Sequence, residues 1–236
     1  MAKPALPSSL GLRNIALLEG LSPERLETLA RDCAWRNFKA EQRIITRAEP
    51  DRDLYFIISG RVRVTTYSAA GRQVTFRDYG PGEHFGEVAA IDGMARSADV
   101  EGLEPGLLAS LTPATLQRLL CEQPALAERL LRDLACLVRR LSERVIDLST
   151  LGVHQRLYAE VLRLAREAGV KANRARIDPA PKHADLAGQV STYREQVTRE
   201  LSALARRGVL GREGRALVVL DVARLQKMVE EVKSGA

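Results

Sequence analysis

The chain has 236 residues, of which 45% are hydrophobic, 4% aromatic and 28% charged. This length favours two small domains with largely aliphatic cores. The formal net charge of +6 mildly favours a polyanionic partner such as nucleic acid. No apolar run is long enough to span a membrane, and the first twenty residues lack the apolar stretch of a signal peptide. We therefore expect a cytoplasmic protein.

The cysteines and histidines are few and scattered. Cys33, Cys121 and Cys136 are odd in number and far apart, which predicts reduced thiols rather than a disulfide framework or an iron–sulfur cluster. The three histidines, His84, His154 and His183, show no metal-ligand spacing. No metal site is expected.

Short helices are predicted over 10–32, where Ser22 is the expected N-cap and Pro23 the first helical residue. Between about Arg43 and Leu111 the pattern changes to short alternating segments separated by glycine turns, which predicts a β jelly roll or sandwich. A helix from Thr112-Pro113 to about Cys121 should follow.

The predicted jelly roll is interrupted by a glycine-rich stretch, GEHFGEVAAIDGMARSADV, at 82–100. Arg96 can hold an anion through two parallel hydrogen bonds, and Gly86 lets the backbone approach closely. If 86–91 is a short helix, its first N–H groups can face the same anion. Glu87 can only accept, which suits a ribose hydroxyl. Together these groups fit a ribose 3′,5′-cyclic phosphate, although an ordinary ion pair between Glu87 and Arg96 is the alternative.

A long helix is predicted from Pro124 to about 148–151, followed by a hinge near 150–153. Its leucines recur with heptad spacing, which is typical of a coiled-coil seam in a two-fold dimer. The alternative is a helix packed on its own β domain. The candidate dimerisation residues are Leu130, Leu134, Leu137, Leu141 and Leu148.

The last third of the chain reads as an amphipathic helix ending at Gly169, a loop over 170–181, then helix, tight turn, helix and β-hairpin. Leu186 and Val190 should pack against Val197 and Leu201 across the turn, as in a helix-turn-helix. A charged, solvated helix with a Glu195–Arg199 pair is the alternative. The candidate DNA-binding residues are Lys182, Tyr193, Arg194, Glu195, Thr198, Arg199 and Arg215, with Arg206 and Arg212 as further phosphate contacts.

The segment FGEVAAIDGMARSA resembles the phosphate-binding cassette of cyclic-nucleotide-binding domains, with Ala95 in place of the usual proline. The resemblance implies that Glu87 binds the 2′-hydroxyl and that Arg96 and Ser97 bind the cyclic phosphate. It also implies that Leu141 and Ser142 on the long helix approach the base. The candidate ligand-binding residues are Gly86, Glu87, Val88, Arg96, Ser97, Leu141 and Ser142.

The segment YREQVTR is similar to the recognition helix of the cyclic-AMP receptor and fumarate-nitrate regulator family. Arg194, Glu195 and Arg199 match that family's base-reading positions, which implies a TGTGA-like half-site. Ser191 replaces the family's turn glycine, and Tyr193 replaces a serine. The resemblance runs from about Leu18 to Val219.

The fold expected is therefore α+β: a cyclic-nucleotide-binding β domain (1–123), a dimerisation helix (124–151) and a winged helix-turn-helix domain (152–236). The function expected is a homodimeric regulator that binds palindromic DNA in response to cAMP and acts on RNA polymerase. Response to cGMP, cyclic di-GMP or no nucleotide is the alternative. No P-loop, nucleophile elbow or metal cluster suggests an enzyme.

Overall fold

The computed structural model describes residues 9–47, 49–68 and 73–230. Its contacts divide the chain into two compact units, each with its own hydrophobic core. The described residues of Met1–Thr66 and Thr75–Val138 form the first unit, and those of Tyr67–Val74 and Arg139–Ala236 form the second. The boundary falls inside the long helix α5 (Pro124–Thr150), so this helix contributes to both units.

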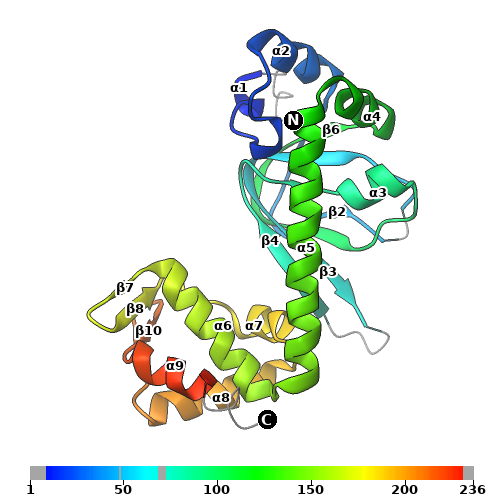
Figure 1. The fold of residues 1–236 in the computed structure, drawn as a ribbon. Coiled ribbons are helices and arrows are strands. Elements are labelled where there is room, and N and C mark those ends of the chain that lie inside the picture. Colours follow the sequence, from blue (N-terminus) through cyan, green and yellow to red (C-terminus); the bar gives the residue numbers. More distant parts are fainter. Residues whose placement is uncertain (1–8, 48, 69–72, 231–236) are drawn as a thin grey trace. The chain divides into compact units, whose positions relative to one another are not determined.

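The first unit is a β-roll flanked by helices (Figure 1). Its strands form one sheet in the order β1-β6-β3-β4, with β2 paired to β6 and β5 paired to β3. Its elements are α1 (Ser9–Leu12), a 3₁₀ turn (Ala16–Leu18), α2 (Pro23–Asp32), β1 (Ala34–Phe38), β2 (Arg43–Ile45), β3 (Leu54–Tyr67), β4 (Gln73–Tyr79), β5 (His84–Phe85), α3 (Glu87–Asp92), β6 (Asp99–Leu111), α4 (Pro113–Glu122) and the first half of α5.

Two helices of this unit begin as the sequence predicts. The side chain of Ser22 accepts a hydrogen bond from the Arg25 amide, and Thr112 accepts one from Thr115. A proline follows each cap at the first helical position, where its missing N–H costs nothing. These caps fix where α2 and α4 start.

The first four residues of β3 are buried on both faces of the sheet. Leu54 and Phe56 belong to one apolar cluster, and the alternate residues Tyr55 and Ile57 belong to another. Because successive side chains in a strand point to opposite faces, β3 holds the two clusters together. Its first residues therefore provide a rigid base for the loop that precedes it.

The second unit combines helices with a small sheet in the order β7-β8-β10-β9 (Figure 1). Gly152 caps the helix after the predicted hinge, and its amide donates to the Gln155 side chain. The elements are the second half of α5, α6 (Val153–Ala168), β7 (Val170–Lys171), β8 (Arg174–Ile177), α7 (His183–Gln189), α8 (Arg194–Arg206), β9 (Leu210–Glu213), β10 (Ala216–Val219) and α9 (Val222–Glu230).

The loop predicted over 170–181 is wrong, because this segment contains β7 and β8. Ala175 and Ile177 are buried and pair with Val219 and Leu217 of β10. The alternation in RARI is that of a half-buried strand, and the two prolines that suggested a loop follow the strand. The predicted two-stranded hairpin is therefore part of a four-stranded sheet.

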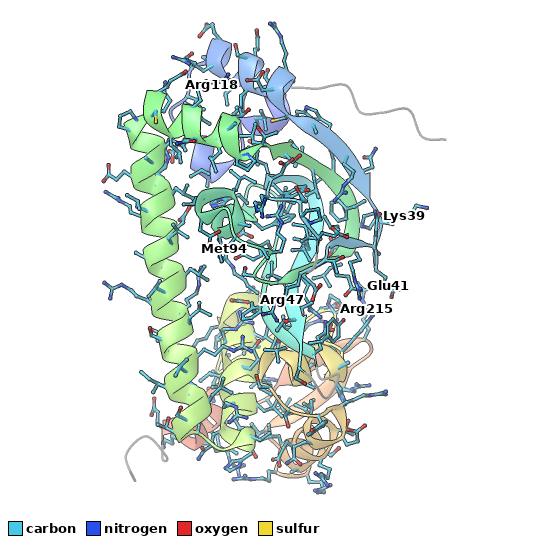
Figure 2. All side chains as sticks on the ribbon, turned by 90° about the vertical axis from the view of Figure 1, so that its right-hand side faces the viewer. Lys39, Glu41, Arg47, Met94, Arg118 and Arg215 are labelled. Carbon is cyan, nitrogen blue, oxygen red and sulfur yellow. The ribbon has the colours of Figure 1, made fainter. Side chains whose placement is uncertain are left out.

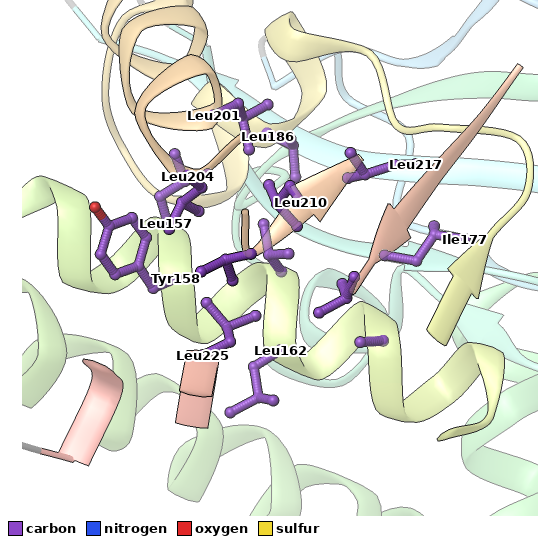
Figure 3. Close-up of a cluster of buried hydrophobic side chains, with 14 of the residues drawn as sticks. Leu157, Tyr158, Leu162, Ile177, Leu186, Leu201, Leu204, Leu210, Leu217 and Leu225 are labelled. Atoms are coloured by element: carbon purple, nitrogen blue, oxygen red, sulfur yellow. The ribbon is translucent and has the colours of Figure 1, made fainter. Parts of the chain in front are cut away.

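The core of the second unit confirms the predicted packing of the helix-turn-helix (Figure 3). Leu186, Val190, Val197 and Leu201 are all buried. Ala187 is also buried, so the two helices cross where a small side chain lies between them. Helix α9 was not predicted from the sequence, and its Leu225 completes this core.

Candidate ligand cradle and DNA-binding helix

Arg96 lies at the centre of the candidate ligand site in the first unit. Its side chain is only 2% exposed. Nη1 donates to the Gly86 carbonyl at 3.0 Å, and Nη2 donates to the Asp53 carbonyl at 2.9 Å and to Asp51 Oδ2 at 2.7 Å. The guanidinium is therefore held by the start of α3 on one side and by the loop before β3 on the other.

Gly86 is required where it stands. Its φ of 87° lies in the left-handed region that favours glycine. A Cβ atom built there would approach Arg96 Nη1 and the Asp53 carbonyl to 2.8 Å each. The glycine thus allows α3, which begins at Glu87, to start directly beside the guanidinium.

Arg96 forms its ion pair with Asp51 rather than with Glu87. Asp51 also accepts hydrogen bonds from the Tyr55 hydroxyl at 2.8 Å and from the Asp53 amide at 3.0 Å. Burial alone would raise the pKa of Asp51, but these hydrogen bonds and the Arg96 charge bring that pKa below its ordinary value. Asp51 is therefore a charged partner of the guanidinium at neutral pH.

Asp51, Asp53 and Tyr55 were not among the predicted site residues. Burial raises the pKa of Asp53, whose carboxylate accepts from Ser110 instead of facing Arg96. Tyr55 stacks on Phe85, with the ring centroids 5.1 Å apart. The signal in the sequence was the two aspartates, Asp51 and Asp53, in EPDRDLY, directly before a buried strand.

The other predicted ligand residues lie on either side of Arg96 in the chain or on α5. Glu87 and Val88 form the first turn of α3 and are half-buried, while Ser97 is exposed. The loop between them carries Met94, which is 66% exposed (Figure 2). Leu141 and Ser142 are exposed on the part of α5 that belongs to the second unit, and their contact with a base stays a prediction.

In the second unit, the turn of the helix-turn-helix is tight and its backbone is strained at one residue. Ser191 has a φ of 54°, the left-handed conformation that the family's glycine adopts easily. The next amide, of Thr192, donates to the Ala187 carbonyl at 2.9 Å. Ser191 therefore keeps the turn geometry at the cost of backbone strain.

The recognition helix α8 presents its predicted DNA-binding residues to solvent. Tyr193 occupies the N-cap position and is 62% exposed, and the four others are also exposed. Those four are Arg194, Glu195, Thr198 and Arg199. Their exposure at the N-terminal end of α8 is the arrangement that reaches base edges in a major groove.

The remaining predicted contacts lie on other elements of the second unit. Lys182 is exposed at the N-cap of α7. Arg215 is exposed beside the tip of the β9–β10 hairpin, where its Nε donates to Asp178 at 3.0 Å (Figure 2). Residues 139–230 contain 18 Lys or Arg against 11 Asp or Glu, so the chain's entire positive excess lies there. This charge suits a phosphate backbone.

The exposed apolar face of α5 differs from the predicted seam in one of its two heptad series. Leu134, Leu141 and Leu148 are half-buried or exposed, in the predicted register. Leu130, by contrast, is 3% exposed and packs in the core of the first unit, and Leu137 in the same series is half-buried. The series that alternates with Leu134 on the surface is Leu131, Val138 and Val145, exposed at 66%, 61% and 63%.

Among the described residues, no group of His, Cys, Asp and Glu side chains could hold a metal ion, and the three cysteines are free. Burial raises the pKa of the Cys33 thiol to about 12, which keeps it protonated. No helix in the described ranges is long and apolar enough to cross a membrane.

The fold combines three features: a β-roll that buries an arginine beside a glycine turn, a long helix, and a helix-turn-helix with an exposed basic face. This combination defines a ligand-responsive transcription regulator. Comparison with known families agrees. The family described as "Cyclic nucleotide-binding domain" matches residues 35–123, and "Crp-like helix-turn-helix domain" matches residues 155–228. Together these matches cover both units.

Similar proteins span nearly the whole chain. The "CRP-like cAMP-activated global transcriptional regulator" of Mycobacterium tuberculosis is 27% identical over 92% of this chain and 97% of its own. The "Cyclic AMP receptor protein" of Thermus thermophilus is 29% identical over 92% of this chain and 98% of its own. A solved CRP-family transcriptional regulator, also from Thermus thermophilus, is 26% identical, with a TM-score of 0.66 over 83% of this chain and 96% of that one.

The chain belongs to the CRP/FNR family of transcription regulators. It is a cyclic-nucleotide-binding, DNA-binding regulator and not an enzyme. The fold class predicted from the sequence is confirmed.

Proposed function

We propose that this protein is a homodimeric transcription regulator whose effector is cAMP. In the proposed site, Arg96 and Ser97 bind the cyclic phosphate and Glu87 accepts from the 2′-hydroxyl of the ribose. The backbone of Gly86, Glu87 and Val88 assists at the start of α3. The observation that carries the proposal is the buried guanidinium of Arg96, whose Nε has no hydrogen-bond partner among the described atoms.

That unpartnered Nε fits an anion with several oxygens. A buried donor without a partner is costly, and a cyclic phosphate offers two exocyclic oxygens that can accept from Nε and a second nitrogen. The names of two full-length relatives, one cAMP-activated and one a cyclic AMP receptor, favour cAMP over cGMP and cyclic di-GMP. Leu141 and Ser142 are proposed to contribute to the choice of base.

For the DNA-binding function, we propose that the protein acts in the cytoplasm as a dimer on palindromic sites with TGTGA-like half-sites, in contact with RNA polymerase. Arg194 and Arg199 are suited to guanine, and Glu195 can accept from cytosine. The dimer is proposed to form through α5, with Leu134, Leu141 and Leu148 alternating with Leu131, Val138 and Val145. Nucleotide must bind the DNA-competent state more tightly, because otherwise it shifts no population.

The test is calorimetry of the full chain with cAMP, cGMP and cyclic di-GMP, with and without a palindromic duplex. We expect cAMP to bind most tightly, and the duplex to strengthen its binding. Arg96→Gln should weaken cAMP binding by about a hundredfold or more, as expected for loss of a charged, buried hydrogen-bonding group.

The matched control is Arg52→Gln, which removes an exposed guanidinium that donates to the Met94 carbonyl in the same region. Its affinity for cAMP should stay close to wild type. Equal losses in the two variants, or unchanged binding in Arg96→Gln, would refute the site. Thermal melting of each variant shows whether the fold is retained.

A further inference from the structure

We propose that Asp51 is an internal competitor for the phosphate-binding guanidinium and thereby sets the affinity of the protein for cyclic nucleotide. The inference rests on the proposed function, because it takes Arg96 as the phosphate ligand. Asp51 lies in the loop between β2 and β3, and its Oδ2 is 2.7 Å from Arg96 Nη2. This carboxylate occupies a nitrogen that a bound phosphate needs.

A counter-ion is necessary because the guanidinium is removed from water. Its side chain is 2% exposed, and an isolated charge with that burial is strongly destabilised. The carbonyls of Gly86 and Asp53 supply only dipoles, whereas Asp51 supplies a full negative charge. Asp51 therefore stabilises Arg96 in its binding position while no nucleotide is present.

The same contact leaves the guanidinium incompletely satisfied. Arg96 Nε is buried and has no partner among the described atoms, while Nη2 donates to both Asp51 and Asp53. A phosphate that accepts from Nε and Nη2 together would satisfy both nitrogens. Exchange of Asp51 for phosphate thus gains one hydrogen bond at the guanidinium.

Asp51 is the more exposed side of the pair. Its side chain is 32% exposed, so it can turn toward water. Arg96 is held by the Gly86 and Asp53 carbonyls, and its guanidinium lies 5.7 Å from the centre of the Tyr55 ring. Phosphate therefore meets a fixed cation and a displaceable anion.

This competition lowers nucleotide affinity in two ways. Nucleotide binds the fraction of molecules in which Asp51 has released Nη2, and the apparent affinity falls in proportion to that fraction. A carboxylate that stays nearby also repels the phosphate charge. Replacing Asp51 with asparagine removes the charge and keeps one oxygen, which can accept from the Asp53 amide as Oδ1 does, while the side-chain NH2 group takes the place of Oδ2 beside the Tyr55 hydroxyl.

The experiment is calorimetry of cAMP binding to the full chain, comparing wild type with Asp51→Asn. We expect Asp51→Asn to bind about tenfold more tightly, since one neighbouring negative charge is removed. Asp51→Ser is a second variant without the charge, and its affinity should shift in the same direction. Thermal melting without ligand reports the loss of the ion pair separately.

Glu49→Gln is the matched control. It removes a negative charge two residues away in the same loop, but from an exposed carboxylate that accepts from the Thr46 hydroxyl. Its affinity should change by less than about threefold, because only the longer-range Coulomb interaction is lost. Tightening equal to that of Asp51→Asn would overturn the specific role of Asp51.

Two further results bear on the inference. If wild type binds cAMP and both Asp51 variants bind equally or more weakly, Asp51 only positions Arg96, and this inference alone is overturned. If neither wild type nor Asp51→Asn binds cAMP or cGMP, the proposed effector is wrong and the inference is overturned with it. The inference is supported if Asp51→Asn binds cAMP clearly while wild type binds it only weakly.

Discussion

Arg144, on the last part of α5, donates a hydrogen bond from Nη2 to the carbonyl of Gln189, 3.0 Å away. Gln189 is the final residue of α7, directly before the turn of the helix-turn-helix. Arg156 of α6 donates to the next carbonyl, of Val190, also at 3.0 Å. Two arginines outside the motif thus fix the turn from which the recognition helix starts. The same helix also contributes Leu130 to the core of the first unit.

The first prediction is that Arg144→Ala weakens DNA binding without removing any DNA contact. Loss of a charged hydrogen bond to a half-buried carbonyl destabilises the turn by about 1–3 kcal/mol. The turn should then open more often, and the affinity for a palindromic duplex should fall about three- to tenfold. Fluorescence anisotropy measures the affinity, and amide hydrogen exchange over 189–193 measures the opening.

Arg140→Ala is the control, since it removes the same charge from the exposed surface one turn earlier on α5. Both variants lower the net charge equally, so a general electrostatic effect on DNA would weaken both. Equal affinity losses, or unchanged exchange in Arg144→Ala, would show that Arg144 does not hold the turn.

The second prediction concerns the apolar face of α5. Val138 is 61% exposed and lies midway between Leu131 and Val145 in the same heptad series. Val138→Glu places a charge in the proposed seam, and we expect the dimer to dissociate at least tenfold more readily. Sedimentation velocity across a concentration series measures this. Cys136→Glu adds the same charge to an exposed position two residues earlier, off the seam, and should leave the dimer intact.

The sequence predicted those features that depend on local periodicity or on a single residue type. Buried Leu186 and Val197 follow from helical spacing, and the cap at Ser22 follows from its hydroxyl. The partner of Arg96 could not be predicted in this way, because Asp51 is 45 residues away and loop side chains have no period. The heptads were ambiguous for a similar reason: leucines at 130 and 131 fit two registers, and only tertiary packing shows that Leu130 is the buried one.

The third prediction tests the strain at Ser191. A side chain at a φ of 54° costs about 1 kcal/mol relative to glycine. Ser191→Gly should therefore raise the melting temperature of the second unit, since the strain exceeds the weak 3.5 Å contact from Arg144 to the serine hydroxyl. Ser202→Gly, inside α8, should lower it by a similar amount, because glycine is a poor helix former. A lower melting temperature in Ser191→Gly would contradict the strain argument.

The fourth prediction is that His183 links DNA binding to pH. His183 Nδ1 lies 2.8 Å from the Thr198 hydroxyl, which itself donates to the Arg194 carbonyl at 3.0 Å. The hydroxyl proton is thus engaged, so Nδ1 carries the hydrogen and Nε2 is the site that titrates. Burial and the charges of Arg212 and Arg194 lower the pKa of His183, which is neutral at pH 7 in the free protein.

A DNA phosphate near the recognition helix opposes this lowering of the His183 pKa. Its negative charge favours the imidazolium and raises the pKa of His183 in the complex. Binding then takes up a proton, and duplex affinity should rise as the pH falls from about 8 to about 6. The free energy of unfolding of the free protein should change in the opposite sense and fall as the pH falls. A histidine whose pKa is depressed in the folded state stabilises the fold above its unfolded pKa and loses that contribution at lower pH. His183→Gln should flatten both dependences, whereas His154→Gln, which alters an exposed residue of α6, should flatten neither. A duplex affinity with the same pH slope in wild type and His183→Gln would place the titrating group elsewhere on the DNA-binding face.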